Sequence, residues 1–225
     1  MIASLAQPLF FFLALGFGLN SVVSAGNTSY LSFIAPGIVA MSVLFTSVFS
    51  GIQIIWDRQF GFLKETLIAP VSRTAIMIGQ TLGGATTALI QGIFIIIAVF
   101  FLAKLSFGIG LLIAILFMTL IGISFTAMGI AIASKMEDMH GFQLIMNFLI
   151  MPLFFLSGAL FPISNAPAFL RGIAYVNPLT YGVEGIRYGF LGSSTINPWT
   201  SLLVLGGFGL IMVLLGGYLF KRLKV

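Results

Sequence analysis

The chain has 225 residues, of which 60% are hydrophobic and only 7% are Asp, Glu, Lys or Arg. An ordinary soluble domain has about 25% charged residues, so this composition excludes a water-soluble globule. With a mean hydropathy of +1.18, the sequence predicts an integral membrane protein whose main solvent is lipid. Cysteine is absent, which excludes disulfides, thiolate metal sites and a cysteine nucleophile.

Charges, prolines and polar clusters divide the chain into six apolar segments of about the length needed for a helical crossing. Continuous apolarity favours a helical bundle over a barrel, whose strands would alternate apolar and polar residues. We therefore predict an all-α membrane protein with a single transmembrane domain over 1–225. The predicted spans cover 2–19, 31–56, 75–103, 107–134, 142–161 and 199–220, and the polar stretch 20–28 is predicted to be an external loop.

The segment 162–198 differs from the predicted spans because prolines interrupt it at four positions, Pro162, Pro167, Pro178 and Pro198. It is too broken for one continuous helix, yet it is still rich in aromatic residues. This pattern predicts short amphipathic or re-entrant helices near one membrane interface, between the fifth and sixth spans.

The distribution of Lys and Arg predicts the orientation of the bundle. One side collects seven basic residues in its short loops and at the C-terminus, whereas the other side has three. The positive-inside rule then places the richer side, and with it both termini, in the cytoplasm. The seven are Arg58, Lys64, Arg73, Lys135, Lys221, Arg222 and Lys224, and the three are Lys104, Arg171 and Arg187.

Several kinds of catalysis are excluded by the residues present. A phosphate-binding loop needs Gly-Lys followed by Ser or Thr, and the chain contains no Gly-Lys pair. If ATP drives this protein, a separate chain must hydrolyse it. A serine protease needs a His base beside its nucleophile, but the only His is His140 in a loop, far in depth from Ser157. We predict no enzyme activity and no metal site in this chain.

The polar residues inside the predicted spans are uncharged, since every Asp, Glu, Lys and Arg maps to a loop or a span end. This argues against a proton-coupled carrier, which normally places an ionisable group at mid-membrane depth. The uncharged polar residues either join helices by hydrogen bonds or line a translocation path. They include Gln53, Gln80, Gln91, Gln143 and Asn147. Aromatic residues that either line such a path or contact lipid are Phe10, Phe11, Phe12, Phe17, Phe45 and Phe49.

A charged segment at 57–73 separates the second and third predicted spans. Its apolar residues recur at helical spacing, which predicts a short amphipathic helix that ends before Pro70. Such a helix either rests on lipid head groups or docks into a groove on a cytoplasmic partner. The apolar positions are Phe60, Leu63, Leu67 and Ile68, and the charged ones are Arg58, Lys64 and Glu65.

Two stretches resemble the signatures of a known family, the membrane subunits of type-2 ATP-binding-cassette (ABC) exporters. The first is DRQFGFLKETLIAPVSR at 57–73. The second is PLFFLSGALFP at 152–162, followed by NPLTY at 177–181 and EGIR at 184–187. The resemblance covers nearly the whole chain and is strongest for the drug and nodulation-factor exporter branch. The first signature is matched at Gly61, Leu63, Leu67, Pro70, Val71, Ser72 and Arg73.

The resemblance implies a permease that forms the path for a hydrophobic or amphipathic solute in a prokaryotic inner membrane. It implies a homodimer, or a heterodimer of related permeases, with cytoplasmic ABC ATPase subunits that hold ATP and Mg²⁺, so that this chain itself binds no cofactor. No nucleic-acid partner is expected. Coupling to the ATPase is assigned by resemblance to Arg58, Gly61, Leu63, Glu65, Leu67 and Pro70. The extracellular gate is assigned to Ser157, Gly158, Pro162, Pro178, Glu184 and Arg187, with Glu184 and Arg187 spaced for an i,i+3 ion pair.

The sequence departs from the family in one respect. Family members usually begin with an amphipathic cytoplasmic helix, whereas here Met1 is followed almost at once by the apolar run around Gln7 and Pro8. From the residues alone two alternatives stay open. One is a channel or carrier that needs no nucleotide, and the other is a structural membrane protein that docks a cytoplasmic partner.

Overall fold

The computed structural model describes residues 2–19, 29–68, 70–103 and 108–222, without the side chains of residues 2–4, 19, 64 and 67. The predicted loop at 20–28, Lys104 and Lys224 lie outside these ranges. The elements in the described part are helical throughout, which confirms the predicted all-α class.

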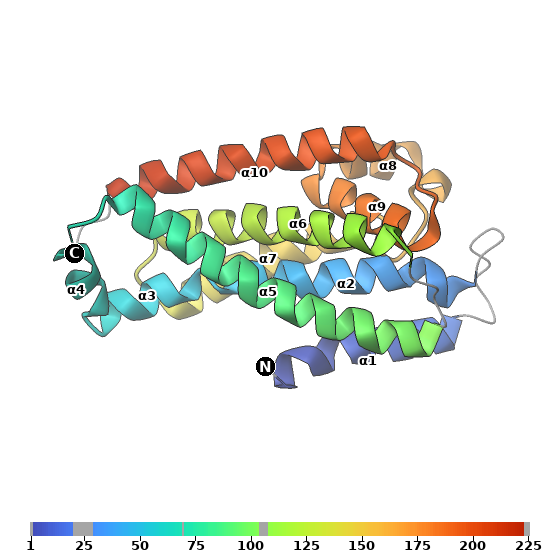
Figure 1. Ribbon diagram of the computed structural model, residues 1–225, viewed down its shortest axis with the longest axis horizontal. Helices are drawn as coiled ribbons and strands as arrows, with labels where there is room; N and C mark the ends of the chain where they lie inside the picture. The colour runs from blue at the N-terminus through green and yellow to red at the C-terminus, as the bar shows by residue number, and fades with distance from the viewer. Residues whose placement is uncertain (1, 20–28, 69, 104–107, 223–225) are drawn as a thin grey trace.

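Four long helical segments run along the longest axis of the molecule (Figure 1). Each is long and apolar enough to cross a membrane. They are α2 (Tyr30–Phe49) continued by α3 (Ile52–Gln59), α5 (Arg73–Ala103), α6 (Gly110–Ala133) and α10 (Pro198–Lys221). Two further helices, α1 (Ile2–Leu19) and α7 (Met139–Phe155), contain the shorter apolar stretches Leu5–Gly18 and Met139–Phe155.

Short elements occupy the two ends of the bundle (Figure 1). The helix α4 (Phe62–Ile68) lies with α3 at one end, where α10 finishes. The elements η1 (Ile163–Asn165), α8 (Ala168–Val176) and α9 (Pro178–Leu191) connect α7 to α10 at the other end. The predicted short helices between the last two spans are therefore present.

The core is centred on α6, which packs against α2, α5, α9 and α10. Where α6 crosses the junction of α2 and α3, glycines bring the two backbones together. A Cβ on Gly129 would lie 2.4 Å from the Val48 carbonyl oxygen, and one on Gly51 would lie 2.5 Å from the Gly129 carbonyl carbon. Larger side chains would therefore separate the helices.

Two predicted spans differ from the structure by more than a few residues. The span predicted at 31–56 is interrupted at Ser50 and Gly51, and its helical course continues to Gln59. The span predicted at 142–161 ends as a helix at Phe155, and Gly158, three residues further on, takes a left-handed conformation with φ +73°. It begins earlier, at Met139, since Asp138 caps it by accepting the Gly141 N–H at 2.6 Å. The same hydrogen bond lowers the pKa of Asp138.

Candidate functional site

The segment 57–73 contains the end of α3, a two-residue turn and α4, and it lies at one end of the bundle (Figure 1). Gly61 joins α3 to α4 in a left-handed conformation with φ +84°, which an L side chain rarely adopts. The Gly61 N–H donates to the Arg58 carbonyl at 3.3 Å, and the Phe60 N–H donates to the Trp56 carbonyl at 2.9 Å. The chain therefore turns from α3 into α4 within two residues, Phe60 and Gly61.

Side chains at the end of α3 hold the turn between α6 and α7. The Arg58 guanidinium donates to the carbonyls of Met136 at 3.1 Å and Ser134 at 3.3 Å. The Gln59 amide donates to the Glu137 carbonyl at 3.0 Å. Because three backbone oxygens of one turn accept from α3, a displacement of α3 would be transmitted to α6 and α7.

A further bond connects the far end of the segment 57–73 to the last helix. The Arg73 guanidinium, on the first residue of α5, donates to the Lys221 carbonyl at the end of α10 at 2.8 Å. A cation at a helix C-terminus is also favoured by the helix dipole. The segment therefore contacts the ends of α6, α7 and α10, which lie far from it in sequence.

The helix α4 exposes a mixed apolar and acidic surface. Leu63 is fully buried, whereas Phe62 is 58% exposed and Ile68 is 82% exposed. Glu65 and Pro70 are also exposed. The predicted apolar face was wrong in one detail, because Phe60, 70% exposed, caps the C-terminus of α3 and is not part of α4. The side chain of Leu67 lies outside the described part of the chain.

Replacing Arg58 by Gln is expected to open the turn at 134–138, because the shorter neutral side chain cannot hold both carbonyls. Cleavage after the exposed Lys135 by a lysine-specific protease should become about fivefold faster, as expected for the loss of roughly 1 kcal/mol of hydrogen bonding. Arg171→Gln at the opposite end serves as the control and should leave that cleavage rate unchanged. Equal rates for Arg58→Gln and the unmodified protein would contradict the role of Arg58 in holding this turn.

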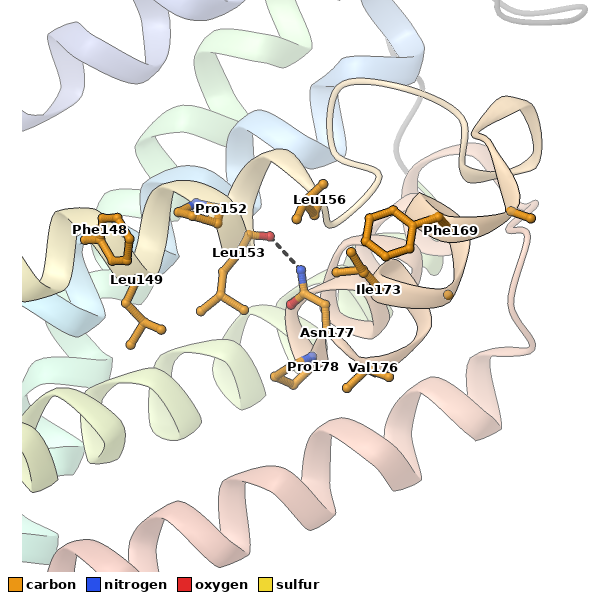
Figure 2. A pocket seen from close by; sticks show the side chains of 12 residues that line it. Phe148, Leu149, Pro152, Leu153, Leu156, Phe169, Ile173, Val176, Asn177 and Pro178 are labelled. Carbon is orange, nitrogen blue, oxygen red and sulfur yellow. Dashed lines mark hydrogen bonds between the residues drawn. The ribbon is translucent and has the colours of Figure 1, made fainter.

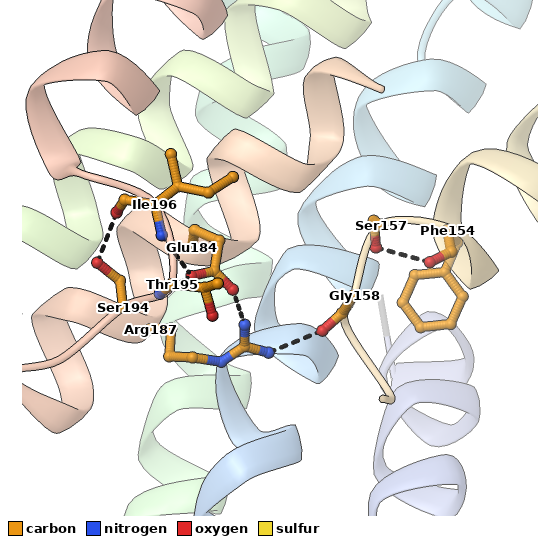
Figure 3. Close-up of polar contacts among 8 residues, drawn as sticks. All are labelled: Phe154, Ser157, Gly158, Glu184, Arg187, Ser194, Thr195 and Ile196. Atoms are coloured by element: carbon orange, nitrogen blue, oxygen red, sulfur yellow. Dashed lines mark hydrogen bonds and ion pairs between the residues drawn. The ribbon is translucent and has the colours of Figure 1, made fainter. Parts of the chain in front are cut away.

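The opposite end of the bundle contains a buried ion pair (Figure 3). Glu184 and Arg187, one turn apart on α9, form the predicted i,i+3 pair, and their residues are 1% and 5% exposed. The second Arg187 nitrogen donates to the Gly158 carbonyl at 2.8 Å. The other Glu184 oxygen accepts the N–H groups of Thr195 at 2.5 Å and Ile196 at 3.3 Å. Each charge thus has backbone partners as well as the opposite charge, whereas the Arg187 Nε is buried without a hydrogen-bond partner.

An aromatic contact extends this network to α2. The Arg187 guanidinium lies 4.3 Å from the centroid of the Phe33 ring, a distance at which a cation is attracted to the ring face. Nearby on α2, the Tyr30 hydroxyl donates to the Leu160 carbonyl at 3.2 Å. The network therefore joins α2, the connection after α7, α9 and the turn that precedes α10.

The remaining predicted gate residues lie beside this network without joining it. The Ser157 hydroxyl donates to the Phe154 carbonyl at 2.6 Å. Pro162 precedes η1, and Pro178 is the first residue of α9. Of the six predicted gate residues, the structure brings together Gly158, Glu184 and Arg187.

An apolar cavity of about 800 Å³ lies between α7 and α8 (Figure 2). Its polar contribution comes from Asn177, whose amide donates to the Leu153 carbonyl at 2.6 Å. Asn177 also caps α9 by accepting the Leu179 N–H at 3.0 Å. Among the described residues, no group of three His, Cys, Asp or Glu could hold a metal ion.

Several contacts in both regions had no signal in the sequence. The acceptors at Ser134, Met136 and Gly158, and the donors at Thr195 and Ile196, are backbone groups. Every residue type offers the same backbone carbonyl, so residue identity could not reveal these partners. Phe33 could not be distinguished by sequence from the other 23 of the 24 phenylalanines.

The long apolar helices, with the charged segment 57–73 at one end and a buried ion pair at the other, define a multi-pass membrane protein. The chain belongs to the ABC-2 type transporter family, which it matches over residues 1–191. The signatures at 57–73 and 152–187 lie within that range, so the resemblance predicted from them is confirmed.

Three relatives illustrate the family. A ycf38 protein of Porphyra purpurea, named as a transport permease, is 34% identical over 84% of this chain and 66% of its own length. The inner membrane transport permease YadH of Escherichia coli K12 is 28% identical over 75% of this chain and 66% of its own length. Nodulation protein J of Rhizobium leguminosarum bv. viciae is 28% identical over 88% of this chain and 77% of its own length. The alignments thus span about two thirds of ycf38 and YadH.

Proposed function

We propose that this chain is the permease subunit of an ATP-driven exporter and that a separate ABC ATPase subunit supplies the energy. The permease forms the membrane path for a hydrophobic or amphipathic solute and carries out no covalent chemistry. It works as a dimer, with itself or with a related permease, in the cytoplasmic membrane. In this proposal α1 and α7 complete a six-span bundle with both termini in the cytoplasm, and ATP and Mg²⁺ bind to the partner.

The observation that carries the proposal is the way the segment 57–73 is connected to the bundle. It exposes the apolar side chains of Phe60, Phe62 and Ile68 as well as the side chain of Glu65, a combination suited to a groove on another protein. At its two ends Arg58 and Arg73 hold the ends of α6 and α10. A push on α4 would therefore displace several long helices together.

In the proposed cycle, ATP-driven closure of two partner subunits moves α4 and shifts the permease between inward-open and outward-open packings. The network of Glu184 and Arg187 is the gate at the far end. Because it joins four parts of the chain through specific hydrogen bonds and the contact of Arg187 with the Phe33 ring, it has the discrete contacts that a two-state element needs. Opening the gate would require some of these hydrogen bonds to break and their groups to find other partners.

The proposal requires an ATPase companion. Co-expressed with an ATPase subunit that carries Gly-Lys-Ser/Thr, the permease should purify with it in equal amounts. Phe62→Glu should reduce the retained ATPase about tenfold, because an interface anchor of this kind contributes more than about 1 kcal/mol. The matched control is Phe169→Glu on α8, since Phe169 is 76% exposed at the opposite end. A purified complex without any nucleotide-hydrolysing companion would refute the proposed function.

A further inference from the structure

One face of α5 carries a polar stripe. Gln80, Gly84, Thr87 and Gln91 follow the spacing i, i+4, i+7, i+11, which places them on the same side of a helix. At 1.5 Å per residue the stripe is about 16 Å long, roughly half the thickness of the hydrocarbon core of a bilayer. Polar side chains are costly in lipid unless they are paired, as the Thr87 hydroxyl is with the Gly83 carbonyl at 3.1 Å.

A second stripe lies on α2, against which α5 packs. Ser42, Phe45 and Phe49 follow i, i+3, i+7, and the Phe45 ring lies 6.3 Å from that of Phe49 and is tilted by only 22°. Gln53 follows on α3, after the interruption at Ser50 and Gly51. This stripe therefore combines a polar group with two roughly parallel aromatic rings.

Two cavities lie between these stripes. One, of about 400 Å³, is lined by Gln7 of α1 together with Ser42 and Gln91. The other, of about 370 Å³, is lined by Gln53 and Gln80. Phe49 and Thr87 line both cavities, so the two share walls. We call them together the α2–α5 groove.

The chemistry of the α2–α5 groove is polar and uncharged. The residues that line it include Gln, Ser and Thr but none of Asp, Glu, Lys, Arg or His. Two of its polar atoms are buried without a hydrogen-bond partner, the Ser42 hydroxyl oxygen and the Gln80 amide oxygen. Ser42 as a residue is only 1% exposed. Leaving such groups unpaired costs about 1 to 3 kcal/mol each, so the groove favours an occupant that pairs with them.

From this arrangement we infer that the α2–α5 groove binds an uncharged amphipathic solute with a hydroxyl-bearing head group. The hydroxyls of the solute donate to the Gln80 amide oxygen and form hydrogen bonds with the Ser42 hydroxyl. Phe45 and Phe49 contact the apolar faces of the solute. A charged head group finds no counter-ion there and would have to lose its hydration. The inference rests on the proposed transport function and narrows its substrate class.

Photolabelling tests this site directly in membranes that contain the full chain. The probe is octyl glucoside with a diazirine in its alkyl chain, used below its micellar concentration and without ATP. Labelled peptides should come from 42–53 and 80–91. Unlabelled octyl glucoside should compete about tenfold more strongly than octyl sulfate or octyltrimethylammonium, which have the same chain length but a charged head group.

The variant Gln80→Leu/Thr87→Val should lower the labelling about fivefold, because it removes two hydrogen-bonding groups of the groove. Gln143→Leu/Thr86→Val makes the same chemical changes at exposed positions outside the groove and should label normally. Thr87→Ser keeps the hydroxyl and should also label normally, which separates a loss of binding from misfolding.

Equal competition by the three detergents, or equal labelling of both double variants, would overturn the inference. Disulfide cross-linking of two Thr87→Cys chains to each other would also overturn it, since a second copy would then cover the groove. The labelling needs neither nucleotide nor partner. An ATPase that purifies with the permease while labelling fails would therefore reject the groove and leave the proposed transport function standing.

Discussion

Replacing Glu184 by Gln is expected to destabilise the protein more than any substitution of a lipid-facing residue. Gln keeps an oxygen for the N–H groups of Thr195 and Ile196, so the substitution removes mainly the charge. Arg187, 5% exposed, would then be a buried cation without its counter-charge, which typically costs about 3 to 5 kcal/mol. We expect a clear drop in the midpoint temperature of aggregation measured by size-exclusion chromatography of the heated, detergent-solubilised protein.

The double variant Glu184→Gln/Arg187→Met shows whether the loss of stability comes from an unpaired buried charge or from altered packing. Once both charges are absent, no unpaired ion is buried, so the double variant should be more stable than Glu184→Gln alone. Glu65→Gln is the control, because Glu65 is exposed on α4, and it should leave the midpoint unchanged. If Glu184→Gln is as stable as the unmodified protein, the ion pair does not hold this end of the bundle together.

Replacing Gly61 by Pro should uncouple transport from ATP hydrolysis while membrane insertion stays normal. Proline restricts φ to about −65°, whereas Gly61 has φ +84°, so the turn between α3 and α4 cannot keep its shape. Because α4 is the proposed contact with the ATPase, we expect substrate-stimulated ATPase activity of the reconstituted complex to fall at least about tenfold. Glu65→Arg, which reverses the charge of the exposed face of α4, should act in the same direction.

Gly61→Asn is the matched control for this substitution. A Cβ at this position would have no heavy atom within 4 Å, and Asn tolerates the left-handed region better than most residues. It should therefore retain much of the coupled activity that Gly61→Pro loses. Unchanged substrate-stimulated ATPase activity in both Gly61→Pro and Glu65→Arg would exclude the segment 57–73 as the site of coupling.

The helices could be predicted well where a continuous run of apolar residues marks them in the sequence. The predicted first span at 2–19 coincides with α1, and the predicted third and sixth spans differ from α5 and α10 by at most two residues at each end. Runs of apolar residues between charges determine these elements whatever surrounds them. The fifth span was predicted to end six residues too late, since the sequence 156–161 is apolar enough for a helix, whereas α7 ends at Phe155 and Gly158 has a left-handed conformation.

The candidate sites were predictable to a lesser degree. The pairing of Glu184 with Arg187 follows from their spacing on a helix. Gly61 could be recognised as the glycine of the family signature at 57–73. That Arg58 holds the turn at 134–138 could not be read from its position, because the acceptors are carbonyls 76 and 78 residues away. The polar residues Gln53, Gln80 and Gln91 were recognised one by one, but their placement around shared cavities depends on how α5 packs on α2.

By itself, the sequence determined that this is a helical membrane protein of the ABC-2 family, because apolar length, charge position and short motifs are properties of consecutive residues. Only the tertiary structure decided which backbone groups meet the buried charges and which polar residues face one another. Those contacts join segments that are distant along the chain, and their partners are often peptide groups that every residue carries alike. The physical reason is that a hydrogen bond forms only where a donor and an acceptor lie close together in space. Which groups lie close together is determined by the packing of α2, α5, α6, α9 and α10 against one another.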